Sequence, residues 1–406
     1  MTHRIIAGFM PLLDSALLVA AREKGFAEAE GIDLLLLRET SWASIRDRLA
    51  VGQAQVAHML GPMPIACNLG LWPLAARTAM PMALGLGGNA VTVSLALWAE
   101  MEAEGAPPDL APAPVGAALR HVTARRRLRL AVVHPHSGHS YELRYWLAAS
   151  GAVPGRDVEI VVLPPSLMPD ALGSGAIDGF CAGEPWNTAA VMRGQGRIAT
   201  VEAAIWRQSP EKVLGVDAAW AEANPEALDA LLRALHRASA WCGTPGHRGE
   251  LAALLAQPGH VGCPEEWLLP ALSGELQVGQ GETARVPDFF VPQASAATFP
   301  WKSHALWFYS QMVRWGQVGH CAEAAATARE TYRPDLWRRA LAPLGVAQPS
   351  ANAKVEGTLT HPTPVGSAGA SLVLGPDGFF DGARFDPDSL DAYIAGQRGS
   401  GTARES

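Results

Sequence analysis

The chain has 406 residues, of which 49% are hydrophobic and 17% are charged, and its formal net charge is -7. This length exceeds what one hydrophobic core usually supports and predicts two domains, while the composition excludes a disordered chain. The mild negative charge offers no basic surface for direct nucleic-acid binding, and no apolar run approaches the roughly 20 residues that span a membrane. Five scattered cysteines without metal or redox spacing predict free thiols in a reducing, cytoplasmic compartment.

The first hundred residues alternate between strand-like and helix-like segments. Strands are predicted at residues 4–8, 33–37 and 56–60, and helices at residues 15–24 and 44–51. This alternation is typical of an α/β domain, in which helices cover a parallel sheet. We therefore assign residues 1–100 to a first lobe.

A second lobe is predicted over residues 125–208, after a proline-rich loop and a basic entry helix. Its predicted strands are at residues 128–133, 158–163 and 178–182, and its helices at residues 141–150 and 169–174. RLAVGQAQVAHMLGPMP of the first lobe is similar to ALGSGAIDGFCAGEPWN of the second, which favours two equivalent lobes. Residues 215–345 are predicted to return to the first lobe, with helices at residues 225–242, 248–255 and 302–315. Residues 346–406 are predicted to form a wrapping tail.

The chain contains no GxSxG, HExxH, P-loop or Rossmann motif, so we predict no catalytic residue, no metal and no cofactor. The three histidines of HPHSGHS, residues 134–140, lack the nearby carboxylates or cysteines of a metal site. His139 is predicted at a helix N-terminus, where unpaired N–H groups suit a small anion. A solvated loop histidine is the alternative.

Two further residues have donors that suit an anion. The indole N–H of Trp42, in ETSWASIRDRL, can donate to an oxyanion, although packing at a helix start is the commoner role of such a residue. Lys212, in SPEKVLGV, is a surface lysine by its pattern alone. It becomes a binding residue only if its segment borders a cleft.

Several long segments, in order over about residues 5–394, resemble the nitrate/bicarbonate-binding solute receptors of ABC uptake systems. They are GFMPLLDSALLVAAREKGF, SWASIRDRLAVGQAQVAHMLGPMP, LGGNAVTVS, HSGHSYELRYWLAASG, MPDALGSGAIDGFCAGEPWN, IWRQSPEKVLGV, YRPDLWRRAL and FFDGARFDPDSLDAY. The resemblance implies a type II periplasmic-binding-protein fold, in which two α/β lobes enclose a ligand cleft. It also implies a binding protein rather than an enzyme.

The resemblance implies a ligand set as well. Family members bind nitrate through a tryptophan, an amide, a histidine and a lysine, which the matching segments place at Trp42, Asn89, His139 and Lys212. Related proteins often have glutamine at the position of Asn89, so the shorter amide changes its reach. GEPWN places Glu184 and Trp186 as cleft or hinge residues.

The chemistry of nitrate fits this set, because a buried anion requires hydrogen-bond donors and charge compensation. Lys212 and a protonated His139 are expected to supply charge, and Trp42 and Asn89 to supply directional donors. Bicarbonate carries a proton and needs an acceptor or a metal nearby. Glu211 could be that acceptor.

A cytosolic branch of the family, the NasS-like nitrate/nitrite sensors, restrains an RNA-binding antiterminator partner until ligand arrives. Because the first strand is predicted almost at Met1, we expect this chain to be such a sensor, with an ANTAR-type, NasT-like partner and no contact with a membrane. The alternative is the substrate-binding component of a nitrate or bicarbonate ABC transporter. An enzyme on the same fold, similar to thiamin-pyrimidine synthases, is a weaker alternative, because their cysteine-rich motif is missing.

Overall fold

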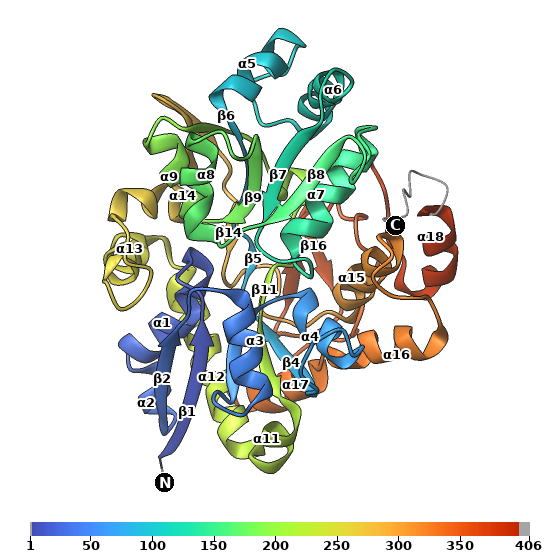
Figure 1. The fold of residues 1–406 in the computed structure, drawn as a ribbon. Helices are drawn as coiled ribbons and strands as arrows, with labels where there is room; N and C mark the ends of the chain where they lie inside the picture. The colour runs from blue at the N-terminus through green and yellow to red at the C-terminus, as the bar shows by residue number, and fades with distance from the viewer. Residues whose placement is uncertain (1, 398–406) are drawn as a thin grey trace.

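The computed structural model describes residues 2–397, which form two α/β lobes connected by crossing segments (Figure 1). The first lobe surrounds a five-stranded sheet of order β2-β1-β3-β11-β4. Its strands are β1 (His3–Phe9), β2 (Ile32–Arg38), β3 (Val56–Leu60), β4 (Thr78–Ala83) and β11 (Lys212–Asp217). β1 runs parallel to β2 and β3, whereas β11 is antiparallel to both of its neighbours.

The second lobe repeats this arrangement around a sheet of order β10-β6-β9-β7-β8. Its strands are β6 (Asn89–Ser94), β7 (Leu128–Val132), β8 (Val158–Val162), β9 (Gly179–Gly183) and β10 (Gly196–Val201). β7 is parallel to β8 and β9, and β6 is antiparallel to β9 and β10. In both sheets the strand that arrives from the other lobe is antiparallel, so both sheets are mixed, whereas a parallel sheet was predicted for the first lobe.

One helix in each lobe begins at the interface between the lobes. In the first lobe this is α3 (Trp42–Ala50), where Ser41 Oγ accepts a hydrogen bond from Ser44 N at 3.1 Å. In the second it is α7 (Gly138–Ala149), where Ser137 Oγ accepts from Ser140 N at 3.0 Å. Such serine N-caps stabilise a helix start. They place Trp42 and His139 in the first turns of the two helices.

The crossing from the first lobe to the second lies earlier than predicted. β6 and the following α5 (Leu95–Ala103) belong to the second lobe, whereas residues 1–100 were assigned to the first. The crossing is the glycine-rich segment before β6, in which Gly85, Gly87 and Gly88 have φ values of 120°, 67° and 94°. A Cβ on Gly87 would lie 2.4 Å from the carbonyl oxygen of Phe289. The apolar pattern of the sequence continues through the crossing without a break, so only the glycine cluster indicates the change of lobe.

The remaining helices cover the two sheets. They are α1 (Ala16–Glu23), α2 (Phe26–Ala29), α4 (Pro62–Asn68), α6 (Pro112–Thr123), α8 (Met168–Gly173), α9 (Trp186–Met192), α10 (Glu202–Ile205), α11 (Ala218–Ala223), α12 (Pro225–Cys242), α13 (Arg248–Ala256), α14 (Leu269–Ser273), α15 (Lys302–Arg314), α16 (Ala322–Thr331) and α17 (Pro334–Leu341). α12 packs on α1 and α17 of the first lobe. Within residues 2–397, none of the helices has the length and apolar character needed to cross a bilayer.

Residues 215–345 were predicted to return to the first lobe. In the structure, part of this segment packs on the second lobe instead. β12 (Glu275–Gly279), which pairs with β13 (Glu282–Arg285), packs on α9 and β10 of the second lobe. β14 (Phe290–Val291) pairs with β5 (Leu86–Gly87) at the crossing itself. These contacts join segments far apart in sequence, so local patterns do not reveal them.

The C-terminal segment, drawn in red in Figure 1, runs along both lobes. It contains short strands and one helix, namely β15 (Gln348–Pro349), β16 (Thr363–Val365), β17 (Ser367–Ala368), β18 (Leu372–Leu374) and α18 (Leu390–Gln397). Phe379 stacks on Trp206 with ring centroids 4.6 Å apart, and Tyr145 Oη donates to Asp381. The predicted tail extends to residue 406, and residues 398–406 lie outside the described part.

Candidate functional site

The four predicted ligand residues meet at the interface of the lobes. Trp42 begins α3, Asn89 begins β6, His139 is the second residue of α7, and Lys212 begins β11. All four are buried, and Lys212 is only 1% exposed. Burial rules out the interpretations of Lys212 as a surface lysine and of His139 as a solvated loop residue.

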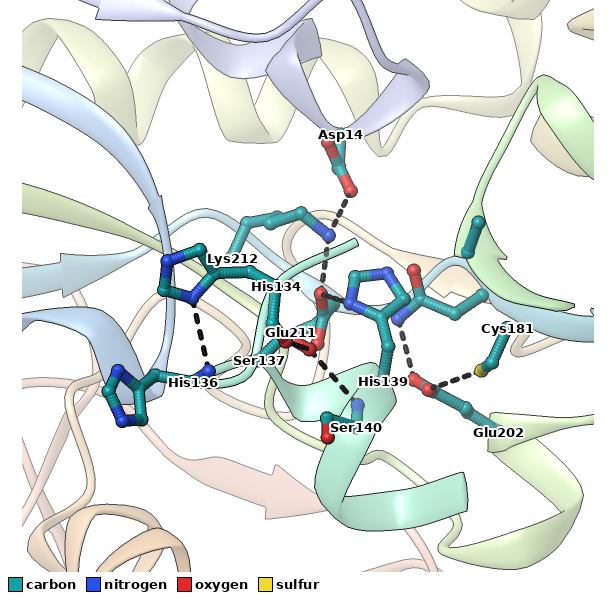
Figure 2. A network of polar contacts seen from close by, with 12 residues as sticks. Asp14, His134, His136, Ser137, His139, Ser140, Cys181, Glu202, Glu211 and Lys212 are labelled. Atoms are coloured by element: carbon teal, nitrogen blue, oxygen red, sulfur yellow. Dashed lines mark hydrogen bonds and ion pairs between the residues drawn. The ribbon is translucent and has the colours of Figure 1, made fainter. Parts of the chain in front are cut away.

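Lys212 lies between two carboxylates, as Figure 2 shows. Its Nζ is 2.8 Å from Asp14 Oδ2, it forms an ion pair with Glu211, and it lies 5.7 Å from the Trp42 ring centroid. His58 Nε2 is 3.1 Å from the other Asp14 oxygen. Burial alone would raise the pKa of Asp14, but Lys212 and His58 hold this pKa well below its usual range. Lys212 and Asp14 therefore form a buried pair of opposite charges.

His139 is neutral, which corrects the prediction that it carries a charge. Its Nδ1 lies 3.2 Å from Glu211 Oε1. Burial lowers the pKa of His139 well below its ordinary value, and the positive charge of Lys212 lowers this pKa further. The sequence indicated the helix N-terminus but not the desolvation, which depends on how the two lobes close around the ring.

Asn89 is held by a second carboxylate. Its Nδ2 donates to Glu202 Oε2 at 2.6 Å, and Cys181 Sγ donates to Glu202 Oε1 at 3.2 Å. Burial raises the pKa of Glu202 to about 8, and the neighbouring charge of Glu211 contributes. Glu142 of α7 is equally buried, and burial raises its pKa well above the ordinary value.

Sequence reasoning missed most of the acidic groups of this site. Asp14, Glu142 and Glu202 were not singled out, and Glu211 was considered only for bicarbonate. Asp14 and Glu202 stand in largely apolar segments, such as PLLDSALL around Asp14. A lone acid among apolar residues is a weak indication of a buried functional group, because charged residues are rarely buried without a partner.

Several polar atoms of the site have no hydrogen-bond partner among residues 2–397. These are the indole Nε1 of Trp42, Nε2 of His139, and Oδ1 of Asn89. A buried polar group without a partner costs roughly 1–3 kcal/mol. Some other buried indole nitrogens in the described chain also lack partners, but these groups come from three segments and surround one ion pair. Such an arrangement can bind a small polar ligand.

Glu184 and Trp186, the predicted cleft or hinge residues, lie beside this interface. The backbone oxygen of Glu184 accepts from Leu13 N at 2.9 Å, and its N–H donates to Gly88 O at 3.2 Å. Its carboxylate accepts from the backbone and hydroxyl of Thr188, both at 3.1 Å. Trp186 is half-buried at the start of α9. Glu184 thus joins both lobes at the crossing, and hinge motion stays a prediction.

Two mixed α/β sheets exchanging strands around a buried polar site define a periplasmic-binding-protein-like fold. The crystal structure of the periplasmic nitrate-binding protein NrtA from Synechocystis PCC 6803 is similar, with a TM-score of 0.85 and 29% identity over 97% of this chain and 98% of that one. The MOPS-bound alkanesulfonate-binding protein SsuA of Xanthomonas axonopodis pv. citri shares the fold, with a TM-score of 0.55 and 17% identity over 76% and 93% of the two chains. These similarities confirm the predicted fold.

The chain belongs to the NMT1-like family, whose model matches residues 2–256. It is 33% identical over 402 residues to the nitrate/nitrite binding protein NrtA of Synechococcus elongatus, which covers 97% of this chain and 85% of that protein. It is 29% identical over 402 residues to the bicarbonate-binding protein CmpA of the same species, covering 95% and 85%. Because these full-length relatives are binding proteins, the chain is a binding protein rather than an enzyme.

Proposed function

We propose that this protein is the solute receptor of an ABC uptake system and that nitrate or nitrite is its solute. The similarity to NrtA supports the solute class. The observation that carries the proposal is the unpaired indole N–H of Trp42 beside the buried ammonium of Lys212. Nitrate and nitrite bring oxygen acceptors and no hydrogen, so they match a donor that has no other partner.

The site draws on both lobes, which gives a mechanism for ligand-dependent closure. Trp42 and Lys212 belong to the first lobe, and Asn89 and His139 belong to the second. An anion held by all four residues stabilises the closed arrangement more than an open one, so its binding shifts the population toward closure. Because the four residues are buried, the anion must enter while the lobes are apart.

Calorimetric titration with nitrate, nitrite, bicarbonate and chloride tests this proposal. We expect binding of nitrate or nitrite and no binding of chloride. Trp42→Phe, which keeps the ring and removes one donor, should weaken the binding. Trp72→Phe is the matched control, because it removes a buried indole N–H from the loop after α4. Equal weakening by both variants, or no heat with either nitrogen oxyanion, would overturn the proposal.

Bicarbonate is the second candidate solute, and one observation favours it. Asn89 Oδ1 and Glu211 Oε2 are buried acceptors with no partner among the described residues, and bicarbonate has a hydroxyl that could donate to one of them. The similarity to CmpA points to the same solute. In the same titration, bicarbonate binding without nitrate or nitrite binding would select this candidate.

The cytosolic sensor predicted from the sequence is an alternative use of the same site. The similar NrtA of known structure is a periplasmic nitrate-binding protein, which favours a receptor outside the cytoplasmic membrane over a NasS-like sensor. The two roles differ in their partners. A NasT-like antiterminator that co-purifies without nitrate and is released by nitrate would establish the sensor, and cell fractionation would locate the protein.

A further inference from the structure

The amide of Asn89 can present either its oxygen or its nitrogen to a ligand. The carboxyl group of Glu202 determines which of the two is presented. Its Nδ2 donates to Glu202 Oε2 at 2.6 Å, which leaves Oδ1 buried without a partner among residues 2–397. In this orientation Asn89 offers the ligand an acceptor, because its Nδ2 is engaged by the carboxyls of Glu202 and Glu211. Nitrate and nitrite cannot donate to it, so the arrangement conflicts with the solute proposed above.

The position of Cys181 resolves the conflict, because it determines where Glu202 can carry a proton. Cys181 Sγ donates to Glu202 Oε1 at 3.2 Å, and burial keeps the pKa of this thiol well above its ordinary value, so the thiol stays a donor. A proton on Glu202 must therefore lie on Oε2, which faces Asn89. The Asn89 amide can then turn by half a rotation, accept this proton with Oδ1 and point Nδ2 toward the ligand.

The charges around the site favour the same state. Lys212 pairs with two carboxylates, Asp14 and Glu211, so a bound monoanion adds negative charge to a site in which carboxylates already outnumber the ammonium. An ionised Glu202 would add a further negative charge in a region of low dielectric, at a high electrostatic cost. A proton on Glu202 removes this charge and supplies the donor that turns Asn89.

We infer that Glu202 is a positioning residue for selectivity, whose proton turns the amide of Asn89 toward an oxyanion without hydrogen. The inference rests on the proposed function, because it takes Asn89 as a ligand residue. When Glu202 loses the proton, Oδ1 faces the site again, and nitrate and nitrite bind more weakly. Glu202 acts through Asn89 and is not proposed to touch the ligand.

Other charged groups face Glu202 and influence its titration, so the comparison with a Glu202 variant is needed to isolate it. Glu142 approaches from α7 and Glu211 precedes β11, and burial raises the pKa of both carboxyls. Lys212 keeps its charge, because two carboxylates raise its pKa against the effect of burial. Arg197 of β10 pairs with Glu282 at 2.7 Å. Burial raises the pKa of Glu202 itself to about 8, so the proton is present at neutral pH and is lost as pH rises through about 8.

The test is a nitrate titration of the full chain between about pH 6 and about pH 9, with nitrate as probe because it stays a monoanion. Wild-type affinity should be level below about pH 7 and about tenfold lower at about pH 9. Near about pH 8.5, binding should take up a proton, seen as heats that differ between buffers of different ionisation enthalpy. Glu202→Gln, whose amide can always donate to Asn89, should bind without this pH dependence and without proton uptake.

Glu184→Gln is the control, because burial raises the pKa of Glu184 to about 7 and it titrates in the same range. Whatever its affinity, this variant should keep the fall at high pH. A constant wild-type affinity, or a Glu202→Gln variant that still loses affinity, would overturn the inference alone. Failure of wild type to bind nitrate or nitrite near about pH 6.5 would overturn the proposed function and this inference with it.

Discussion

The two lobes bring different kinds of groups to the same site. The first lobe supplies the charged side, in which Lys212 pairs with Asp14 beside His58. The second lobe supplies a side of groups that are neutral at neutral pH, namely His139, Glu142, Cys181 and Glu202, together with Asn89. The difference indicates a division of roles: the charged side provides attraction, and the neutral side decides which hydrogen bonds a ligand can form.

The largest effect should follow from removing the charge of the first lobe. Lys212→Met should weaken nitrate binding by at least about a hundredfold, because charge-assisted hydrogen bonds are lost. The variant also leaves Asp14 buried without its cation, which should cost roughly 3–5 kcal/mol of stability. The measurements are calorimetric affinity and the free energy of unfolding in urea.

A double variant separates these two effects. Asp14→Asn with Lys212→Met removes both charges and should recover most of the stability while nitrate binding stays absent. Lys302→Met, which disrupts a pair with the exposed Glu330 far from the site, is the control and should not change nitrate binding appreciably. Nitrate binding by the double variant at wild-type strength would contradict the role of the charged side.

A smaller effect is expected for the donor next to this charge. Trp42→Phe removes one hydrogen bond to an anion, worth roughly 1.5–2 kcal/mol, and should weaken nitrate binding about ten- to thirtyfold. An unchanged nitrate affinity would show that the indole N–H does not face the ligand.

A still smaller effect should come from the helix start of the second lobe. Ser137→Ala removes the N-cap of α7 and should cost about 1 kcal/mol of stability and a few-fold of nitrate affinity, since His139 follows directly. Ser94→Ala removes the N-cap of α5, where Ser94 accepts from Leu97 N at 3.1 Å. It should cost similar stability and leave the affinity unchanged, so a loss of affinity in both would point to general loosening.

The smallest effect is expected for pH, which should not change nitrate affinity near the ordinary pKa of histidine. Because burial and Lys212 hold the pKa of His139 well below its ordinary value, His139 is neutral on both sides of that value. Nitrate affinity should therefore stay level between about pH 5.5 and about pH 7, as measured by titration. A tenfold fall in nitrate affinity as pH rises through about 6.5 would show that His139 is protonated below that pH, as predicted from the sequence. Both lobes would then carry charge.

The sequence by itself determined the alternation of strands and helices, the helix starts near Trp42 and His139, and the family resemblance carried by long ordered segments. These features are local, because hydrophobic periodicity, caps and motifs are written in neighbouring residues. Only the tertiary structure decided that the chain changes lobe at Gly85–Gly88 and that Asp14, Glu142 and Glu202 meet around Lys212. It also decided that His139 is neutral. Charge states and partners of buried groups depend on desolvation and on residues distant in sequence, which no local pattern encodes.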